Sequence, residues 1–305
     1  MPMSNQSINR SCPVCNETQT RPFLFKNGFQ LVRCAQCAMV YTNPVPAEMA
    51  SGNFYDQAGH EYLSPEKLES DYSAVRFKRE LRLFRVFCPR GSVLDVGCSS
   101  GAFLYQLHQQ YPNDYQITGT DVSSAPLAYA EKMGVPVIKD NFLTHSFTTQ
   151  YDAVTFWAVM EHLAEPQLFL DRAAAILKPG GLCFVLVPNL KSLAFRCLGA
   201  KYRYVYNEHL NYFTPQTLQK FMEHKFSVMD LKSTHFNPIV MGQDFRGHGQ
   251  AISRAERVQL LKRTTGYKKS RWMYPVRLGY QTAEAMLAGL KLADNIVIIG
   301  RKNRV

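Results

Sequence analysis

The amino-acid sequence predicts an α/β protein in which a doubly wound, mostly parallel sheet follows a small cysteine-rich ribbon. Between residues 92 and 187, short apolar runs alternate with segments of helical periodicity, as is typical of parallel strands joined by crossover helices. Residues 1–46 instead carry two tight cysteine pairs and short β-prone runs, and they end in the sequence Asn43-Pro44-Val45-Pro46. The two patterns indicate a ribbon with its linker and a separate, larger domain.

The composition is that of a globular protein. The chain has 305 residues and 46% hydrophobic content, enough for one large domain with small appendages. It has no long apolar run and no signal-peptide pattern, so we expect no transmembrane segment and a cytoplasmic location. Its net charge is +11, and twelve basic against three acidic residues lie between Arg254 and the end. The basic character therefore belongs to the C-terminal region.

The ribbon contains four cysteines with metal-ligand spacing. Each pair has two residues between its cysteines, and eighteen residues separate the pairs. Two such turns supply the tetrahedral thiolate set that Zn²⁺ prefers, whereas two unrelated cysteine pairs are the alternative. Four cysteine ligands leave no open position, so the expected zinc is structural and not catalytic. The expected ligands are Cys12, Cys15, Cys34 and Cys37, with strands at 30–33 and 39–41.

The remaining elements follow from periodicity and from turn residues. Residues 47–91 are a helical lead-in with amphipathic helices between 65 and 87, and residues 92–237 form the core. Strands are expected at 93–96, 117–120, 135–138, 153–157, 182–187 and 226–232, and helices at 167–177 and 214–223. Residues 238–305 form the last region, a basic helical insertion followed by a final strand. The stretch 238–292 is weakly patterned, and the strand is expected at 295–300.

A glycine-bearing turn follows the first core strand. The run Val93-Leu94-Asp95-Val96-Gly97-Cys98-Ser99-Ser100-Gly101 lacks the three glycines with which a dinucleotide-binding loop receives a pyrophosphate. Asp95 places a carboxylate where it would repel phosphate and attract a cation. Thr118-Gly119-Thr120-Asp121 ends the second strand with another acid, and a carboxylate can accept two hydrogen bonds from a ribose diol. Taken singly, these acids could equally be helix caps.

Together with the segments 139–142, 151–163 and 177–181, these motifs resemble the class I S-adenosylmethionine-dependent methyltransferases, in the order that the family shows. The resemblance implies a seven-stranded Rossmann-like sheet and S-adenosyl-L-methionine as cofactor. It implies that Asp121 holds the ribose and that Asp140 binds adenine, and Ser99 departs from the family's usual glycine. The cofactor-binding residues implied are Asp95, Gly97, Cys98, Ser99, Gly101, Asp121, Val122, Asp140, Asn141, Phe142, Phe156 and Trp157. Cys98 is expected to pack as a small buried residue.

Two histidines are the candidates for a catalytic base. His162 follows the fourth strand, at the sheet edge where open α/β sheets bind ligands. His209 lies in a segment rich in tyrosine, which we expect to form part of a lid at about 190–213. Either imidazole could instead brace the adjacent chain.

Two features of the sequence concern the methyl acceptor. The ribbon with the phrase His209 to Pro215 resembles a bacterial group found with genes for surface polysaccharides and natural-product sugars, which implies a sugar, nucleotide sugar or related small molecule as acceptor. The basic cluster is either a solvated helix face or a surface for phosphates, a membrane or RNA. Two other hypotheses stay open: an RNA methyltransferase that holds RNA with the ribbon and the basic tail, and an inert binding module. The basic residues concerned are Arg254, Arg257, Lys262, Arg263, Lys268, Lys269, Arg271 and Arg277.

Overall fold

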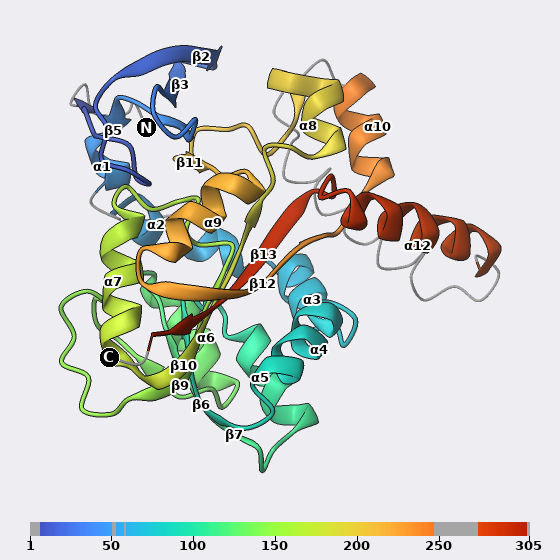
Figure 1. The fold of residues 1–305 in the computed structure, drawn as a ribbon. Coiled ribbons are helices and arrows are strands. Elements are labelled where there is room, and N and C mark those ends of the chain that lie inside the picture. Colours follow the sequence, from blue (N-terminus) through green and yellow to red (C-terminus); the bar gives the residue numbers. More distant parts are fainter. Residues whose placement is uncertain (1–6, 51–52, 58, 247–273, 304–305) are drawn as a thin grey trace.

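A seven-stranded sheet is the centre of the computed structural model (Figure 1), which describes residues 7–50, 53–57, 59–246 and 274–303. The strand order is β12-β13-β10-β9-β6-β7-β8. The pairs β10 with β9, β9 with β6, β6 with β7 and β7 with β8 are parallel, whereas β13 is antiparallel to both β10 and β12. The carboxyl ends of β6, β7 and β9 therefore meet at one edge of the sheet.

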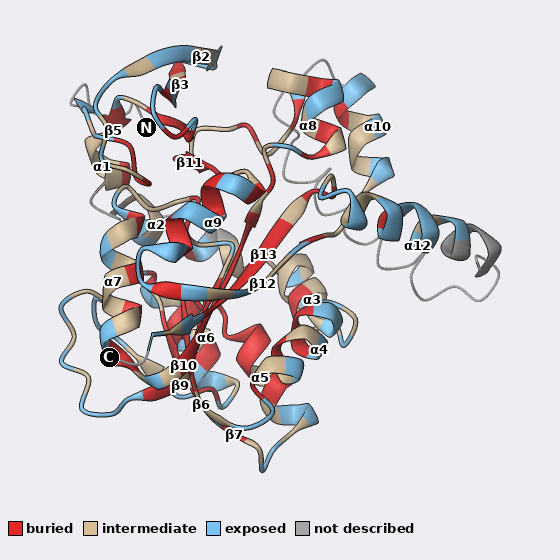
Figure 2. Cartoon of the chain, in the orientation of Figure 1, coloured by how far each residue is buried: buried red, intermediate tan, exposed pale blue. Residues whose placement is uncertain are grey.

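The strands of this sheet are β6 (Gly91–Val96), β7 (Tyr115–Thr120), β8 (Val137–Ile138), β9 (Tyr151–Trp157), β10 (Leu177–Pro188), β12 (Phe226–Thr234) and β13 (Asn295–Lys302). The central strands are buried along most of their length (Figure 2), because helices cover both faces and apolar runs fill them. All the predicted core strands are confirmed within a few residues. β10 begins earlier than expected, at Leu177, and its register against β9 is irregular between Leu177 and Leu182.

The helices around the sheet are α3 (Pro65–Asp71), α4 (Lys78–Phe87), α5 (Ala102–Gln110), α6 (Ser124–Lys132), α7 (Pro166–Ile176) and α9 (Pro215–Glu223). α9 begins where the sequence predicts, because Thr214 and Thr217 form a capping box and Pro215 occupies the first turn. The lead-in also contains α1 (Ala47–Ala50), α2 (Asn53–Gln57) and the 3₁₀ turn η1 (Gly59–Leu63).

The N-terminal ribbon is a four-stranded sheet of order β11-β4-β3-β2. β2 (Thr20–Lys26), β3 (Phe29–Cys34) and β4 (Val40–Thr42) come from the ribbon itself, and a short pair β1 (Ser7–Ile8) and β5 (Val45–Pro46) closes its base. The fourth strand, β11 (Asn211–Tyr212), comes from the segment after β10. The ribbon is thus joined to the larger domain by backbone hydrogen bonds, which the sequence did not predict.

The segment at about 190–213, which the sequence predicts as a lid, packs against the rest of the chain and is named the wall here. It contains α8 (Leu193–Leu198), η2 (Gly199–Lys201) and β11, and Tyr202, Val205 and Leu210 are buried within it. Beyond β12 lie α10 (Pro238–Arg246) and α12 (Tyr274–Gly289), and α12 projects away from the sheet (Figure 1). No helix among the described residues is long and apolar enough to cross a membrane.

Candidate functional site

The turn between β6 and α5 has the close backbone packing that glycine allows. Gly97 has a φ of 72°, and a Cβ there would lie 2.6 Å from Val159 Cγ2 in the loop after β9. Gly101, with a φ of 76°, caps the N-terminus of α5. Ser99 also adopts a positive φ of 50°, in the left-handed region that favours glycine. The positive φ angles at these positions let the chain turn sharply between β6 and α5.

Asp121 connects this loop to the end of β7. Its two carboxylate oxygens accept hydrogen bonds from Ser99 N at 2.8 Å and from Ser123 N at 2.9 Å. Burial raises the pKa of Asp121, while these N–H groups oppose the rise. Each oxygen keeps a further lone pair, so the carboxylate can hold the loop and still accept from a diol.

Asp95 is a second buried acid at the same edge. Its Oδ1 accepts a hydrogen bond of 2.6 Å from the Thr155 hydroxyl on β9. Burial raises the pKa of Asp95 to about 7, and the neighbouring charge of Asp121 adds to the rise. Two acids with raised pKa values at one sheet edge are typical of a site that receives a cationic ligand.

The site fits S-adenosylmethionine on these observations. Ser99 Oγ is buried and has no hydrogen-bond partner among the described residues, so a ligand polar group could satisfy it. Asp95 and Asp121 would hold the ammonium and ribose, and the sulfonium that the cofactor supplies is already activated for methyl transfer.

Asp95, Asp121 and the turn from Gly97 to Gly101 are together named the cradle. The predicted adenine segment lies beside it, where the Thr120 hydroxyl donates to the Asp140 carbonyl at 3.3 Å. The Asp140 carboxylate accepts from Asn141 N at 2.7 Å and pairs with His145 Nδ1 at 3.0 Å, and it faces solvent. Val122 is half exposed next to Asp121. These groups border the site from its open side.

Two of the predicted aromatic contacts are packing residues in this structure. Phe156 is fully buried, and its ring packs against Phe142, which also contacts Phe147 and Phe169. Both rings therefore support the loops from within the core, and their contact with the cofactor stays a prediction. Trp157 packs against the rings of Phe103 and Phe184.

Cys98 is buried beneath the glycine turn, and a Cβ on Gly119 would lie 2.7 Å from its sulfur. Burial raises the pKa of the Cys98 thiol well above its ordinary value. A protonated, enclosed thiol is a poor nucleophile, in agreement with the expected packing role.

His162 lies in the loop after β9, in a partly buried position. Its Nδ1 is 3.0 Å from the Glu208 carbonyl oxygen and 3.1 Å from the Tyr55 hydroxyl, which also donates to that carbonyl. A carbonyl only accepts, so Nδ1 carries the proton and Nε2 carries the lone pair. Burial lowers the pKa of His162 to about 4, so this imidazole is neutral near pH 7.

The structure brings His209 next to His162. The ring centroids of the two imidazoles are 4.7 Å apart. His209 Nδ1 donates to the Tyr204 carbonyl at 2.9 Å, so its lone pair is also on Nε2. The rings of Tyr204, Tyr206 and Tyr212 surround it. The two histidines, 47 residues apart in the chain, thus form one polar cluster enclosed by aromatic rings.

A short chain of contacts joins this cluster to the cofactor cradle. The Ser123 hydroxyl donates to the Tyr55 carbonyl at 2.8 Å, and Ser123 N donates to Asp121. Tyr55 therefore lies between the predicted ribose acid and His162. One tyrosine and one serine thus connect the two histidines to the acid at the end of β7.

The sequence analysis did not identify two residues beside the histidine pair, Tyr55 and Glu161. Tyr55 lies in the lead-in, in a short helix with no motif around it, and only the folded chain brings it to His162. Glu161 precedes the predicted His162 in the chain. Its side chain is only 1% exposed, and the local sequence pattern did not predict this burial. Burial raises the pKa of Glu161 to about 8, and its Oε2 has no partner among the described residues.

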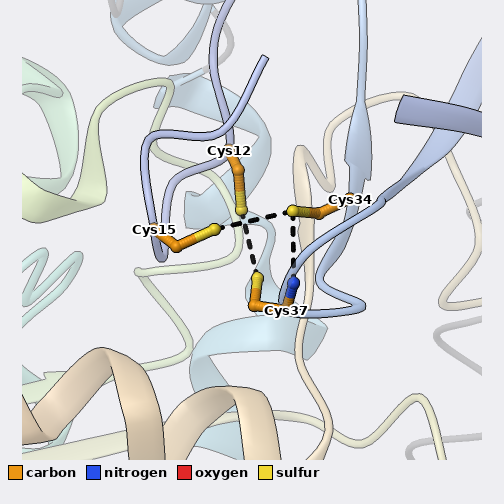
Figure 3. Close-up of side chains that lie close together, drawn as sticks. All are labelled: Cys12, Cys15, Cys34 and Cys37. Carbon is orange, nitrogen blue, oxygen red and sulfur yellow. Dashed lines mark hydrogen bonds between the residues drawn. The ribbon is translucent and has the colours of Figure 1, made fainter. Parts of the chain in front are cut away.

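The four ribbon cysteines converge as predicted (Figure 3). The sulfur atoms of Cys12 and Cys37 are 3.4 Å apart, those of Cys15 and Cys34 are 3.5 Å apart, and all four lie within 4.8 Å of one another. Zinc–sulfur bonds of about 2.3 Å place tetrahedral ligands roughly 3.8 Å apart. The donor set therefore fits one zinc ion.

Arg10 secures the ribbon against the wall that carries His209. Its guanidinium donates to the carbonyls of Thr42 and Ala164, at 3.1 and 2.7 Å, and to Asn211 Oδ1 at 2.9 Å. It also donates to the Leu210 carbonyl, next to His209.

The basic cluster from Arg254 to Arg271 lies outside the described residues, as does the side chain of Arg277.

Part of this chain is similar in sequence to known proteins. Residues 69–225 match the family model of a methyltransferase domain. The chain is 29% identical over 162 residues to the ubiquinone biosynthesis O-methyltransferase of Dinoroseobacter shibae, covering 48% of this chain and 64% of that one. For the enzyme of the same name from Marinobacter nauticus, the identity is 30% over 166 residues, covering 48% and 68%. The chain covers only 50% of the one from Dechloromonas aromatica.

Solved structures show the same fold. An S-adenosylmethionine-dependent methyltransferase of Thermotoga maritima, described as a possible histamine N-methyltransferase, has a TM-score of 0.52 at 16% identity, covering 83% of this chain and 99% of that one. The [4+2]-cyclase SpnF has a TM-score of 0.53 at 19% identity, covering 86% and 99%. The fold thus serves more than one reaction, and the assignment depends on the family match, which spans more than half of the chain. The chain belongs to the methyltransferase-domain family.

Proposed function

We propose that this protein transfers a methyl group from S-adenosyl-L-methionine to a small, hydroxyl-bearing acceptor, with a sugar or nucleotide sugar as the first candidate. The observation that carries the proposal is the contact chain from Asp121 through Ser123 and Tyr55 to His162. It links a cradle suited to the cofactor with the neutral imidazole of His162, which could accept a proton, and with His209 beside it. Relatives named as O-methyltransferases of ubiquinone biosynthesis support a small acceptor.

The cradle would align the methyl donor, and the cluster would receive the acceptor. Asp121 would hold the ribose, Asp95 the cationic part of the cofactor and Asp140 the adenine side. The sulfonium needs no further activation, so alignment and removal of the acceptor proton are the protein's main tasks. Nε2 of His162 or His209 would accept that proton, since Nδ1 of each is held by a carbonyl.

The ribbon would act as a structural support with one bound zinc. Its four cysteines fill the coordination sphere, and β4 and Arg10 hold the segment that carries His209. We assign the ribbon to positioning the acceptor side, because none of its cysteines lies in the cradle.

An S-adenosylhomocysteine release assay tests the proposal with a panel of sugar nucleotides, free sugars, quinol precursors and RNA. We expect turnover with a small acceptor, and His209→Gln should lower kcat by about 100-fold or more, as for loss of a general base. His108→Gln is a matched control, because this histidine lies in the last turn of α5, at the other end of that helix from the glycine turn. Turnover of RNA alone, or full activity of His209→Gln, would contradict the assignment.

A further inference from the structure

Beside the cofactor cradle, three potential metal ligands meet in a second cluster, separate from the ribbon. One nitrogen of His162, one nitrogen of His209 and one carboxylate oxygen of Glu161 lie within 4.8 Å of one another. Glu161 and His162 come from the loop after β9, and His209 comes from the wall before β11. Two imidazoles with one carboxylate form a donor set that binds zinc and other divalent transition metals.

We propose that Glu161, His162 and His209 bind a divalent transition-metal cation. The proposal concerns the bare protein and does not depend on the proposed methyl transfer. The four-cysteine ribbon is a different site, since its sulfur donors favour a closed structural zinc, whereas this set leaves coordination positions open.

The carboxylate of Glu161 carries the first part of the argument. The residue is only 1% exposed, yet Oε2 has no hydrogen-bond partner among the described residues. A buried polar atom without a partner is costly unless another group satisfies it. Each of the two imidazoles has a nitrogen within 4.8 Å of a Glu161 carboxylate oxygen, so the three groups could share one cation.

The orientation of the imidazoles carries the second part. Nδ1 of His162 donates to the Glu208 carbonyl, and Nδ1 of His209 donates to the Tyr204 carbonyl. Metal-binding histidines commonly donate their other ring N–H to a carbonyl in this way, which fixes the tautomer and leaves a lone pair for the metal. In this tautomer each ring carries its lone pair on Nε2, which is the nitrogen that would bind the cation.

The geometry allows one cation to join the three donors. Bonds of about 2.0 to 2.2 Å to nitrogen and oxygen place the ligands of one ion roughly 3 to 4 Å apart. Binding would therefore draw in atoms that are already within 4.8 Å. Three protein donors would leave at least one coordination position of the cation open, and an acceptor oxygen could occupy it.

A bound cation would change the role of the histidines. Their lone pairs would hold the metal, and the metal would lower the pKa of a coordinated hydroxyl by Lewis-acid action. The bound cation would thus make the acceptor lose its proton more easily, which is also the effect of a free imidazole base.

Titration with Co²⁺ tests the site in full-length protein whose ribbon is already loaded with zinc, with no cofactor or acceptor present. Thiolates keep zinc in preference to cobalt, so added Co²⁺ would report the second site. We expect about one Co²⁺ per chain, with visible bands that lack thiolate-to-cobalt charge transfer. Glu161→Gln and His162→Gln should each weaken the affinity by about 100-fold or more, at the upper end of effects seen for residues that only orient ligands.

His145→Gln is the control, because His145 and Asp140 form an exposed histidine–carboxylate pair outside the cluster. It should leave Co²⁺ affinity unchanged, and binding of S-adenosylhomocysteine by the Glu161 and His162 variants would show that they are folded. Absence of stoichiometric Co²⁺ binding, or binding that survives both cluster substitutions, would overturn the proposal. Failure of the methyl-transfer assay would leave this measurement unaffected.

Discussion

Replacing Asp95 by asparagine should make the cofactor-free protein more stable while weakening its affinity for the cofactor. Asparagine has nearly the same shape, and its amide oxygen can accept the hydrogen bond from Thr155 that Asp95 accepts at 2.6 Å. What the substitution removes is a charge at a position that is 3% exposed. The charge of the Asp95 carboxylate therefore lowers the stability of the cofactor-free protein.

The size of the effect follows from the pKa of Asp95, which burial raises from 3.8 to about 7. The folded state then holds the proton more tightly than the unfolded state, so stability falls as pH rises between these two values. At about 1.4 kcal/mol per pH unit, the charge costs about 4 kcal/mol above pH 7 and about 2 kcal/mol near pH 5.5. The asparagine variant lacks this cost.

Urea denaturation of both proteins without cofactor, at about pH 5.5 and 8.5, measures the difference. We expect the variant to be more stable at both values, with a gap wider by about 2 kcal/mol at the higher pH. In a parallel calorimetric titration, S-adenosylmethionine should bind the variant about tenfold or more weakly, as expected for the loss of a charged partner.

Asp152, at the start of β9, is the matched control with the opposite sign. Partial burial opposes its ionisation, but Lys178 and Ser92 hold the pKa of this carboxyl below its ordinary value. Asp152→Asn should therefore destabilise the protein, and the loss should shrink as pH falls through that lowered pKa. An Asp95→Asn gap that stays constant with pH, or that narrows at high pH, would refute the reasoning for Asp95.

Three further outcomes are expected. Asp121→Ala should weaken S-adenosylhomocysteine binding by about 3 kcal/mol, more than 100-fold, because two charge-assisted hydrogen bonds are lost; calorimetry showing unchanged affinity would remove Asp121 from the ribose site. Cys34→Ser should release the ribbon zinc, about one per chain by elemental analysis, and a variant that retains it would contradict the four-cysteine site. Arg10→Met should lower thermal stability and kcat while sparing cofactor affinity, since Arg10 contacts the carbonyl next to His209; an equal loss of cofactor binding would place its effect elsewhere.

The sequence alone determined the local parts of this protein. The strands of the core, the glycine turn after β6 and the acids at the ends of β6 and β7 could be predicted because each depends on residues that are close in the chain. The four ribbon cysteines could be predicted for the same reason, since their spacing places two tight turns opposite each other.

Only the tertiary structure decided how these parts meet. Tyr55 reaches His162, and β11 pairs with β4, through contacts between segments more than 100 residues apart, for which no local pattern exists. The same holds for burial, since an aromatic residue after a strand can face a ligand or the core. Phe142 and Phe156 lie in the core, where their rings fill space in a close-packed cluster.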